Sequence, residues 1–300
     1  MTGQIHDLGY QRYAGSRRPT TSRWTVILRH QIATAWQTWW RFKAWLVVAV
    51  LATGTGVALI YLASDTRLRM VTGLRGAEVQ LADGILPTFL GVFGVYDKIG
   101  FIAALFVATP AIARDVQSGA FTFYFARSVR PRDYVLGKLA GIGAAMALLL
   151  LAGPLVIALA RLGLSDDWDD LIARLPTVAK ALAVGALGTV VYTAMPLACS
   201  ALARSRGHAM VLWAGYYVVF SNLVVVAAMR TSAKWAVLDL PTALQSITLS
   251  MFDLQLRVRR SLDVPAGAAV ISIAAHAAVA IGLMFWQVRN AQRAGVGGAA

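Results

Sequence analysis

The sequence predicts an all-α polytopic membrane protein with six transmembrane helices, and three observations lead to that class. The 300-residue chain is 58% hydrophobic, with a mean hydropathy of +0.63. Only 14% of its residues are charged, whereas a soluble domain carries charge on about a quarter of them. Apolar runs of about twenty residues recur, each long enough to cross a bilayer as a helix. The expected spans are about 45–63, 94–113, 136–160, 181–203, 209–229 and 264–288.

The residues before the first span fall into two parts. Residues 1–21 are a polar leader, while residues 22–43 combine basic side chains with apolar ones at helical spacing. The second pattern is typical of an amphipathic interfacial helix that binds membrane lipid in the headgroup layer. A further interpretation, that this helix also borders a partner subunit, stays open. Its expected anchors are Trp24, Trp36, Trp39 and Trp40.

Three ionisable residues inside the spans are candidates for a transport pathway. The uncharged stretch 99–113 measures only about 22 Å as a helix, which is short for a hydrocarbon core of about 30 Å. The second span must therefore include Asp97 and Lys98, and we expect both at the outer interface. His276 lies in the middle of the last span. It could contact a substrate or a proton, or it could be a neutral histidine hydrogen-bonded between helices.

The segments between the spans carry weaker signals. Residues 165–170 hold four aspartates, which could attract a cation, but they lack a calcium-loop pattern and no metal site is predicted. Residues 289–300 form a short basic tail, and residues 230–263 are too polar to span. Apolar residues nevertheless recur at helical spacing after Pro241, which predicts an amphipathic outer helix. They are Leu244, Ile247, Met251 and Leu254.

Charge predicts the orientation. With both termini inside, the inner segments carry sixteen Lys and Arg against three Asp, a net charge of +13. The outer segments carry twelve basic and eleven acidic residues, a net charge of +1. Cytoplasmic loops are enriched in Lys and Arg, so both termini are expected in the cytoplasm. The overall net charge of +14 is spread over the loops between the spans, so it indicates the orientation of the chain in the membrane. No nucleic-acid partner is predicted.

The inner loop between the second and third spans, residues 113–138, is polar at its ends and aromatic in its middle. Ser118 is a suitable N-cap and Pro131 forces a break, so a short helix is expected between them. An aromatic cluster on a basic loop favours a docking surface for another chain. The same helix could instead be buried against the protein's own span ends.

The loop also carries the pattern of a known family. Asp115, Ser118-Gly119, Arg130-Pro131, Tyr134 and Gly137-Lys138 resemble the first cytoplasmic loop of type-two ABC exporter permeases, and the leader resembles that of bacterial members. The resemblance implies a coupling helix that touches a separate ABC ATPase subunit, present in two copies. It also implies short re-entrant outer helices before the last span. The ATPase-coupling residues would be Ser118, Gly119, Phe121, Tyr124, Phe125, Arg127 and Arg130.

The chain is not expected to be an enzyme. Its Gly137-Lys138 pair lacks the remaining residues of a phosphate-binding loop, so ATP and magnesium are expected on the partner subunit, with no catalytic residue and no cofactor here. The resemblance implies a permease homodimer or pseudo-dimer in a bacterial inner membrane. Gly54, Gly56, Gly137 and Gly141 would leave helix faces open to close packing. The alternative is a non-transporting membrane module, in which the ATPase drives an extracytoplasmic partner or the chain is a scaffold.

Overall fold

The computed structural model describes residues 23–37, 42–64, 84–92, 94–126, 129–253 and 264–297. Within these ranges the chain is helical and contains no strand, which confirms the all-α class. Six of the described helical stretches are long and apolar enough to cross a membrane, as expected. They are Ala44–Ser64, Gly84–Gln117 (with residue 93 outside the description), Pro131–Gly163, Trp168–Leu202, Arg206–Arg230 and Ala266–Arg293. The predicted leader, Trp39 and Trp40 lie outside the described residues.

Several spans are built from more than one helix. The elements in chain order are α1 (Arg23–Gln37), α2 (Ala44–Ser64), η3 (Thr88–Val92), α5 (Val95–Val107), α6 (Pro110–Gln117), α7 (Ala120–Ala126), α8 (Pro131–Leu150), α9 (Ala152–Gly163), α10 (Trp168–Leu202), α11 (Arg206–Ala214), η4 (Gly215–Phe220), α12 (Ser221–Arg230), η5 (Ala233–Leu238), α13 (Leu240–Met251) and α14 (Ala266–Gly297). Pro110 begins α6 after a turn at 108–109, because proline cannot continue the hydrogen-bond ladder of α5.

Two helices extend past the expected spans. Residues 168–180 were expected in an outer loop, yet α10 begins at Trp168. The Asp167 carboxylate accepts a hydrogen bond from the Asp170 backbone N–H at 2.7 Å, and this N-cap starts the helix thirteen residues before the expected span. The tail after residue 288 was expected to be a separate segment, but α14 continues to Gly297. A helix is present where the amphipathic outer helix was expected, as α13, although Leu254 lies outside the described residues.

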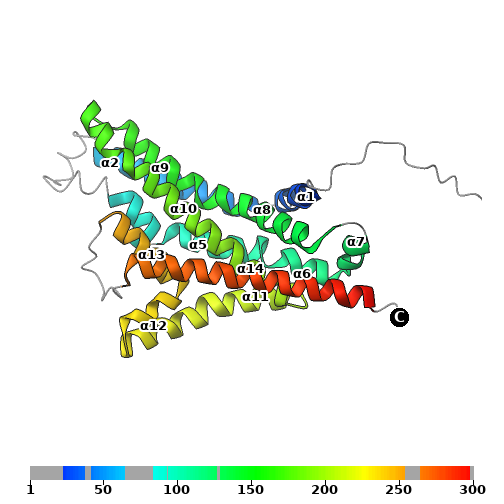
Figure 1. The fold of residues 1–300 in the computed structure, drawn as a ribbon. Helices are drawn as coiled ribbons and strands as arrows, with labels where there is room; N and C mark the ends of the chain where they lie inside the picture. The colour runs from blue at the N-terminus through cyan, green and yellow to red at the C-terminus, as the bar shows by residue number, and fades with distance from the viewer. Residues whose placement is uncertain are drawn as a thin grey trace, which may run out of the picture.

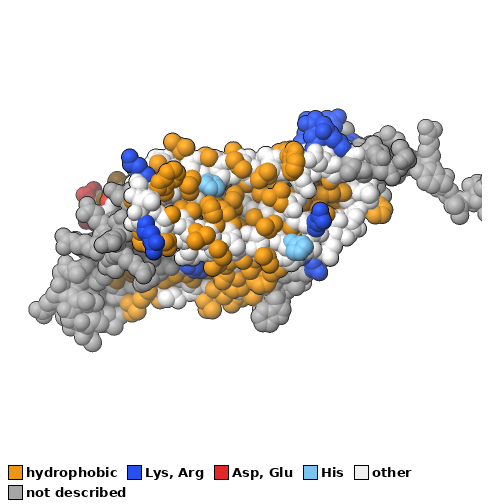
Figure 2. Space-filling view, turned by 90° about the horizontal axis from the view of Figure 1, so that it is seen from below, with side chains coloured by type: hydrophobic (Ala, Val, Ile, Leu, Met, Phe, Trp, Pro, Cys, Tyr) orange, Lys and Arg blue, Asp and Glu red, His pale blue; other side chains and the backbone are white. Residues whose placement is uncertain are grey.

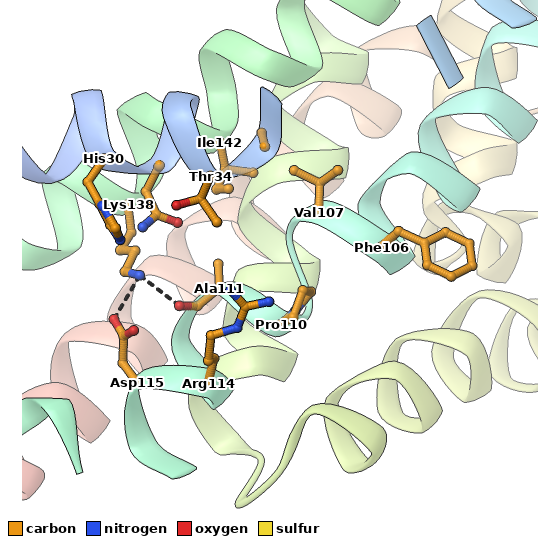
Figure 3. A pocket seen from close by; sticks show the side chains of 12 residues that line it. His30, Thr34, Phe106, Val107, Pro110, Ala111, Arg114, Asp115, Lys138 and Ile142 are labelled. Atoms are coloured by element: carbon orange, nitrogen blue, oxygen red, sulfur yellow. Dashed lines mark hydrogen bonds and ion pairs between the residues drawn. The ribbon is translucent and has the colours of Figure 1, made fainter. Parts of the chain in front are cut away.

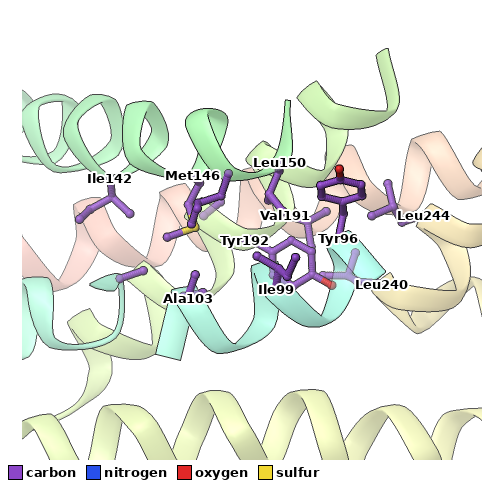
Figure 4. Close-up of a cluster of buried hydrophobic side chains, with 14 of the residues drawn as sticks. Tyr96, Ile99, Ala103, Ile142, Met146, Leu150, Val191, Tyr192, Leu240 and Leu244 are labelled. Carbon is purple, nitrogen blue, oxygen red and sulfur yellow. The ribbon is translucent and has the colours of Figure 1, made fainter. Parts of the chain in front are cut away.

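Helix α10 is the centre of the bundle. It contacts α5, α6, α8, α9, α11, α13 and α14, and Figure 4 shows side chains from several of these helices meeting in one apolar core. By contrast, only 17% of the α2 span and 22% of the Arg206–Arg230 span are buried. Figure 2 shows a broad hydrophobic face with Lys and Arg gathered toward its ends. That distribution suits helices that face lipid across a bilayer.

The two ends of the bundle differ (Figure 1). α1, α7 and the C-terminal end of α14 lie at one end, which we call the α7 end. α13 and the first turns of α10 lie at the other, which we call the α13 end. The described ends of the chain, at Arg23 and Gly297, are therefore on the same side of the bundle, as an even number of spans requires.

Glycines on α8 hold α1 against the bundle. A Cβ at Gly137 would lie 2.6 Å from the Ile27 Cβ, and one at Gly141 would lie 2.6 Å from the Gln31 Cβ. These glycines therefore serve contacts within the chain, so the expectation that they leave a face open to a second copy was wrong. Gly56 is likewise covered by Ile157, whereas a Cβ at Gly54 would meet no other part of the described chain within 4 Å.

The exposed side of α1 keeps the features of an interfacial helix. Ile27, Gln31 and Ala35 form its buried side. Trp36 is 48% exposed and its ring lies near the Lys43 ammonium, while Trp24 is half-buried. An exposed tryptophan beside a lysine is the composition found at membrane surfaces.

Candidate functional site

The loop at the α7 end begins with a sharp turn. The Ser118 backbone N–H donates to the Arg114 carbonyl at 2.9 Å and ends α6. Gly119 follows with φ +66°, a left-handed conformation that glycine adopts without steric cost. Ser118 was expected to be the N-cap of the next helix, but it is the C-cap of α6, and α7 begins two residues later at Ala120.

Behind this turn, a buried ion pair joins α6 to α8. The Lys138 ammonium lies 2.8 Å from the Asp115 carboxylate and donates to the Ala111 carbonyl at 2.7 Å. The Tyr134 hydroxyl donates to the same carboxylate at 2.6 Å. Lys138 is 1% exposed and Tyr134 is fully buried. A buried charge is stable only when paired and hydrogen-bonded, so these contacts hold the ends of the two spans in one arrangement.

The aromatic residues of α7 close over this network. The rings of Phe121, Tyr124 and Phe125 lie 5.3, 5.5 and 6.4 Å from the Tyr134 ring, centroid to centroid. Burial, and then the charge of Asp115, raise the pKa of the Tyr124 hydroxyl, which keeps it protonated. The fourth ring differs, because Phe123 is 74% exposed. α7 therefore uses three aromatic side chains to pack on its own protein and presents the fourth outward.

The remaining predicted residues of the loop have different places. Arg130 is exposed and precedes α8, where its backbone N–H donates to the Asp133 carboxylate at 3.4 Å. Pro131 takes the first helical position, as expected. Arg127 lies outside the described residues.

Sequence reasoning missed a residue that supports the site from α10. The Ser200 hydroxyl accepts hydrogen bonds from the backbone N–H groups of Ile112 and Ala113, both at 2.9 Å. These donors belong to the first turn of α6, the part of a helix where side chains commonly accept from backbone N–H groups. Ser200 is fully buried. No local sequence signal distinguishes this serine from other small residues in a span, because its acceptor role depends on a helix 87 residues away.

The three candidate pathway residues do not form one site. The Asp97 carboxylate is in ion-pair contact with Lys98 at 3.1 Å and accepts hydrogen bonds from the Tyr192 and Tyr217 hydroxyls. The Asp97 side chain is only 11% exposed, whereas that of Lys98 is 62% exposed. His276 lies on α14, with its Nδ1 2.8 Å from the Ser272 carbonyl of the same helix.

A small cavity adjoins the ion pair between α1, α6 and α8 (Figure 3). Its walls include His30, Arg114, Asp115 and Lys138. Among the described residues, no group of three or more His, Cys, Asp or Glu could hold a metal ion.

Comparison with known proteins adds one match. A family model described as ABC-2 family transporter protein matches residues 26–256, which include most of α1 and all of α6, α7, α8 and α13. The comparison with curated proteins gives no match.

Proposed function

Because the chain belongs to the ABC-2 family of transporter membrane proteins, we propose that it is the permease subunit of an ABC exporter. In this proposal the chain forms the translocation path, and ATP and magnesium bind a separate ATPase subunit, present in two copies. The α7 end faces the cytoplasm of a bacterial cell and carries both termini, as the excess of Lys and Arg in the inner segments indicates.

We infer that α7 is the coupling helix, and the exposure of Phe123 carries this inference. The Phe123 ring is 74% exposed on a seven-residue helix, so it is available as an aromatic anchor for a partner that binds at the α7 end. The same helix is fixed through Tyr134 to α8 and through Asp115 to α6. A force applied to Phe123 would therefore reach the ends of two spans at once.

The proposal alters the expected roles of the aromatic residues. Phe121, Tyr124 and Phe125 were expected to fill a socket in the ATPase, and they instead support the helix from behind. Phe123 is the residue that fills the socket. Arg130, which is exposed seven residues later in the chain, contributes at the rim, where charge pairs are weak and sensitive to salt.

Co-purification of the ATPase with variants of the permease tests the coupling role. Truncating a buried aromatic anchor costs about 2–4 kcal/mol of binding, roughly thirtyfold or more in affinity. Phe123→Ala should therefore release the ATPase, or leave it bound without transport, while the permease accumulates normally in membranes. Trp168→Ala is the matched control, because Trp168 is 72% exposed at the α13 end. Normal ATPase retention and normal export by Phe123→Ala would refute the coupling role.

Nucleotide-dependent flux in liposomes separates the exporter from the non-transporting alternative. The permease and its ATPase, reconstituted together, should move substrate when ATP is supplied. ATPase activity without flux would favour mechanical transmission or a scaffold. The permease alone should show no turnover of ATP, since its sequence has no phosphate-binding loop.

We further propose that two copies associate through α2 and the Arg206–Arg230 span. These are the two least buried spans, and Gly54 on α2 leaves room for a close approach. The proposal does not rest on Gly137 and Gly141, which α1 covers.

A further inference from the structure

The Arg206–Arg230 span is not one regular α-helix. Between α11 and α12 lies η4, a π-helix of six residues, Gly215–Phe220. The Ser221 backbone N–H donates to the Tyr216 carbonyl, five residues earlier, whereas an α-helix uses the fourth residue back. Single π turns of this kind are frequent at functional sites. When such a turn converts to α-helix, the residues beyond it shift by one position, which is about 100° around the helix axis.

The two halves of this span are held differently. α11 packs on α5, α6 and α10. Its Trp213 indole N–H donates to the Phe101 carbonyl of α5 at 3.2 Å, and the Trp213 side chain is buried. By contrast, α12 lies toward the α13 end and has its main contacts with the short elements η4 and η5 (Figure 1). Its residues are exposed or half-buried apart from Ala228. α11 is therefore fixed to the bundle, whereas little packing resists a turn of α12 about its axis.

A carboxylate on α5 holds the π turn. The Asp97 carboxylate accepts hydrogen bonds from the Tyr217 hydroxyl of η4 and from the Tyr192 hydroxyl of α10. The Lys98 ammonium lies 3.1 Å from the same carboxylate and 3.1 Å from the Tyr217 hydroxyl. Gly100 makes room for Tyr192, because a Cβ there would lie 2.7 Å from its ring. A carboxylate that is largely buried in a span is stable only with such donors, so the network fixes Tyr217 and the register of η4 with it.

Two further contacts hold η4 in place. The Tyr217 ring stacks on the Phe101 ring, with centroids 4.0 Å apart. The hydroxyl of Ser221, the first residue of α12, donates to the Asp239 carboxylate at 2.5 Å, and Asp239 is the N-cap of α13. A turn of α12 would therefore break the contacts of Tyr217 and Ser221 without separating a large apolar interface.

We propose that η4 is a hinge about which α12 turns, and that Asp97 is the latch that holds the hinge in the observed form. In the turned form η4 is α-helical and Tyr217 leaves the carboxylate, while Tyr192 and Lys98 keep Asp97 hydrogen-bonded and paired. The turn changes which α12 side chains the span presents at the α13 end. The proposal concerns the permease fold alone and depends neither on the ATPase nor on transport.

Distance measurements by pulsed electron paramagnetic resonance test the hinge in the purified full chain. Cys199 is replaced first, and spin labels are attached at Met229 on α12 and at Leu182 on α10, which are both exposed. The otherwise unaltered protein should give mainly one distance. Losing a hydrogen bond to a charged group shifts an equilibrium about tenfold or more. Tyr217→Phe should therefore raise the fraction of a second distance about tenfold or more, and Asp97→Asn should do the same.

Tyr96→Phe is the matched control, because Tyr96 is a buried tyrosine of α5 whose hydroxyl lies 2.9 Å from the Thr53 hydroxyl of α2. Its distances should equal those of the unaltered protein. Unchanged distances in Tyr217→Phe and Asp97→Asn would overturn the proposal. The same second distance in Tyr96→Phe would also overturn it, since the change would then reflect a general loosening of the fold. Asp97→Asn keeps the size of the side chain, and it decides the matter if Tyr217→Phe does not fold.

Discussion

At the scale of single residues, the buried pair of Asp115 and Lys138 is the feature on which the candidate site depends. The two residues are 23 positions apart in sequence, yet their charged atoms lie 2.8 Å apart with Tyr134 on the same carboxylate. The aromatic side of α7 packs on that tyrosine. A change in the pair should therefore disturb α7, although neither residue belongs to that helix.

Removing one member of the pair should be more damaging than removing both. Lys138→Met leaves the Asp115 carboxylate without its cation, and breaking a buried pair costs about 3–5 kcal/mol. We expect a clear fall in the melting temperature of the purified protein. The double variant Asp115→Leu, Lys138→Met should recover part of that loss, because no buried charge remains. An unchanged melting temperature in Lys138→Met would show that the pair is not a stabilising contact.

At the scale of elements, the packing of α1 on α8 determines where α1 lies. Gly137 and Gly141 are four residues apart and allow the α1 backbone to approach, with the Trp24 carbonyl 2.8 Å from a Cβ position at Gly137. A helix packed this closely on a span cannot shift independently of it. α1 is thus part of the rigid surroundings of α8, which leads out of the loop that carries α7.

Gly137→Ala should displace α1, since its Cβ would meet the Ile27 Cβ at 2.6 Å and backbone at 2.8 Å. We expect faster proteolysis within α1 and a lower melting temperature. Gly143→Ala is the control on the same helix, because its Cβ would meet only Thr193 atoms at 3.8 and 3.9 Å. If both variants were cleaved like the parent, the close approach would not be what holds α1.

At the scale of the whole molecule, the bundle separates two chemically different ends. α1, α7 and the end of α14 lie together, and the acidic start of α10 lies with α13 at the other end (Figure 1). The exposed faces between these ends are apolar. The arrangement agrees with six membrane crossings, and it fits either orientation of the bundle in the membrane.

Reporter fusions test the proposed orientation. A reporter after Asp167 should be periplasmic and one after Gly297 should be cytoplasmic, because positive charge is retained on the inner side. Fusions within α10 are avoided, since Trp168 is already helical. Two reporters on the same side would contradict the six-span topology.

Cysteine cross-linking tests the proposed dimer. The single native Cys199 is replaced first. Cysteines at Gly54 on α2 and at Leu223, which is 63% exposed on α12, should then link two copies in membranes. A cysteine at Gly137 should not link two copies, because α1 covers it. A monomer in the assembled, active complex would contradict the proposal.

The sequence alone determined the class of the protein and much of its layout. Apolar runs predict spans because the bilayer core requires about twenty such residues whatever their neighbours, and the expected first span, 45–63, differs from α2 by one residue at each end. The loop pattern from Asp115 to Lys138 predicted the family that the comparison confirmed. The start of α10 was missed because an N-cap and a first turn of aspartates read as a polar loop when only hydropathy is considered.

Tertiary structure alone decided where the described aromatic residues of the loop pack. Helical spacing groups Phe121, Tyr124 and Phe125, but it does not say whether that group faces a partner or the protein itself. The answer depends on Tyr134, which occupies the space beside them. Gly137 likewise predicts close packing without naming the helix that packs there, and the partner proves to be α1. Contacts of this kind join positions far apart in the chain, so the local spacing of residues does not predict them. Only the folded arrangement of the spans determines which residues meet.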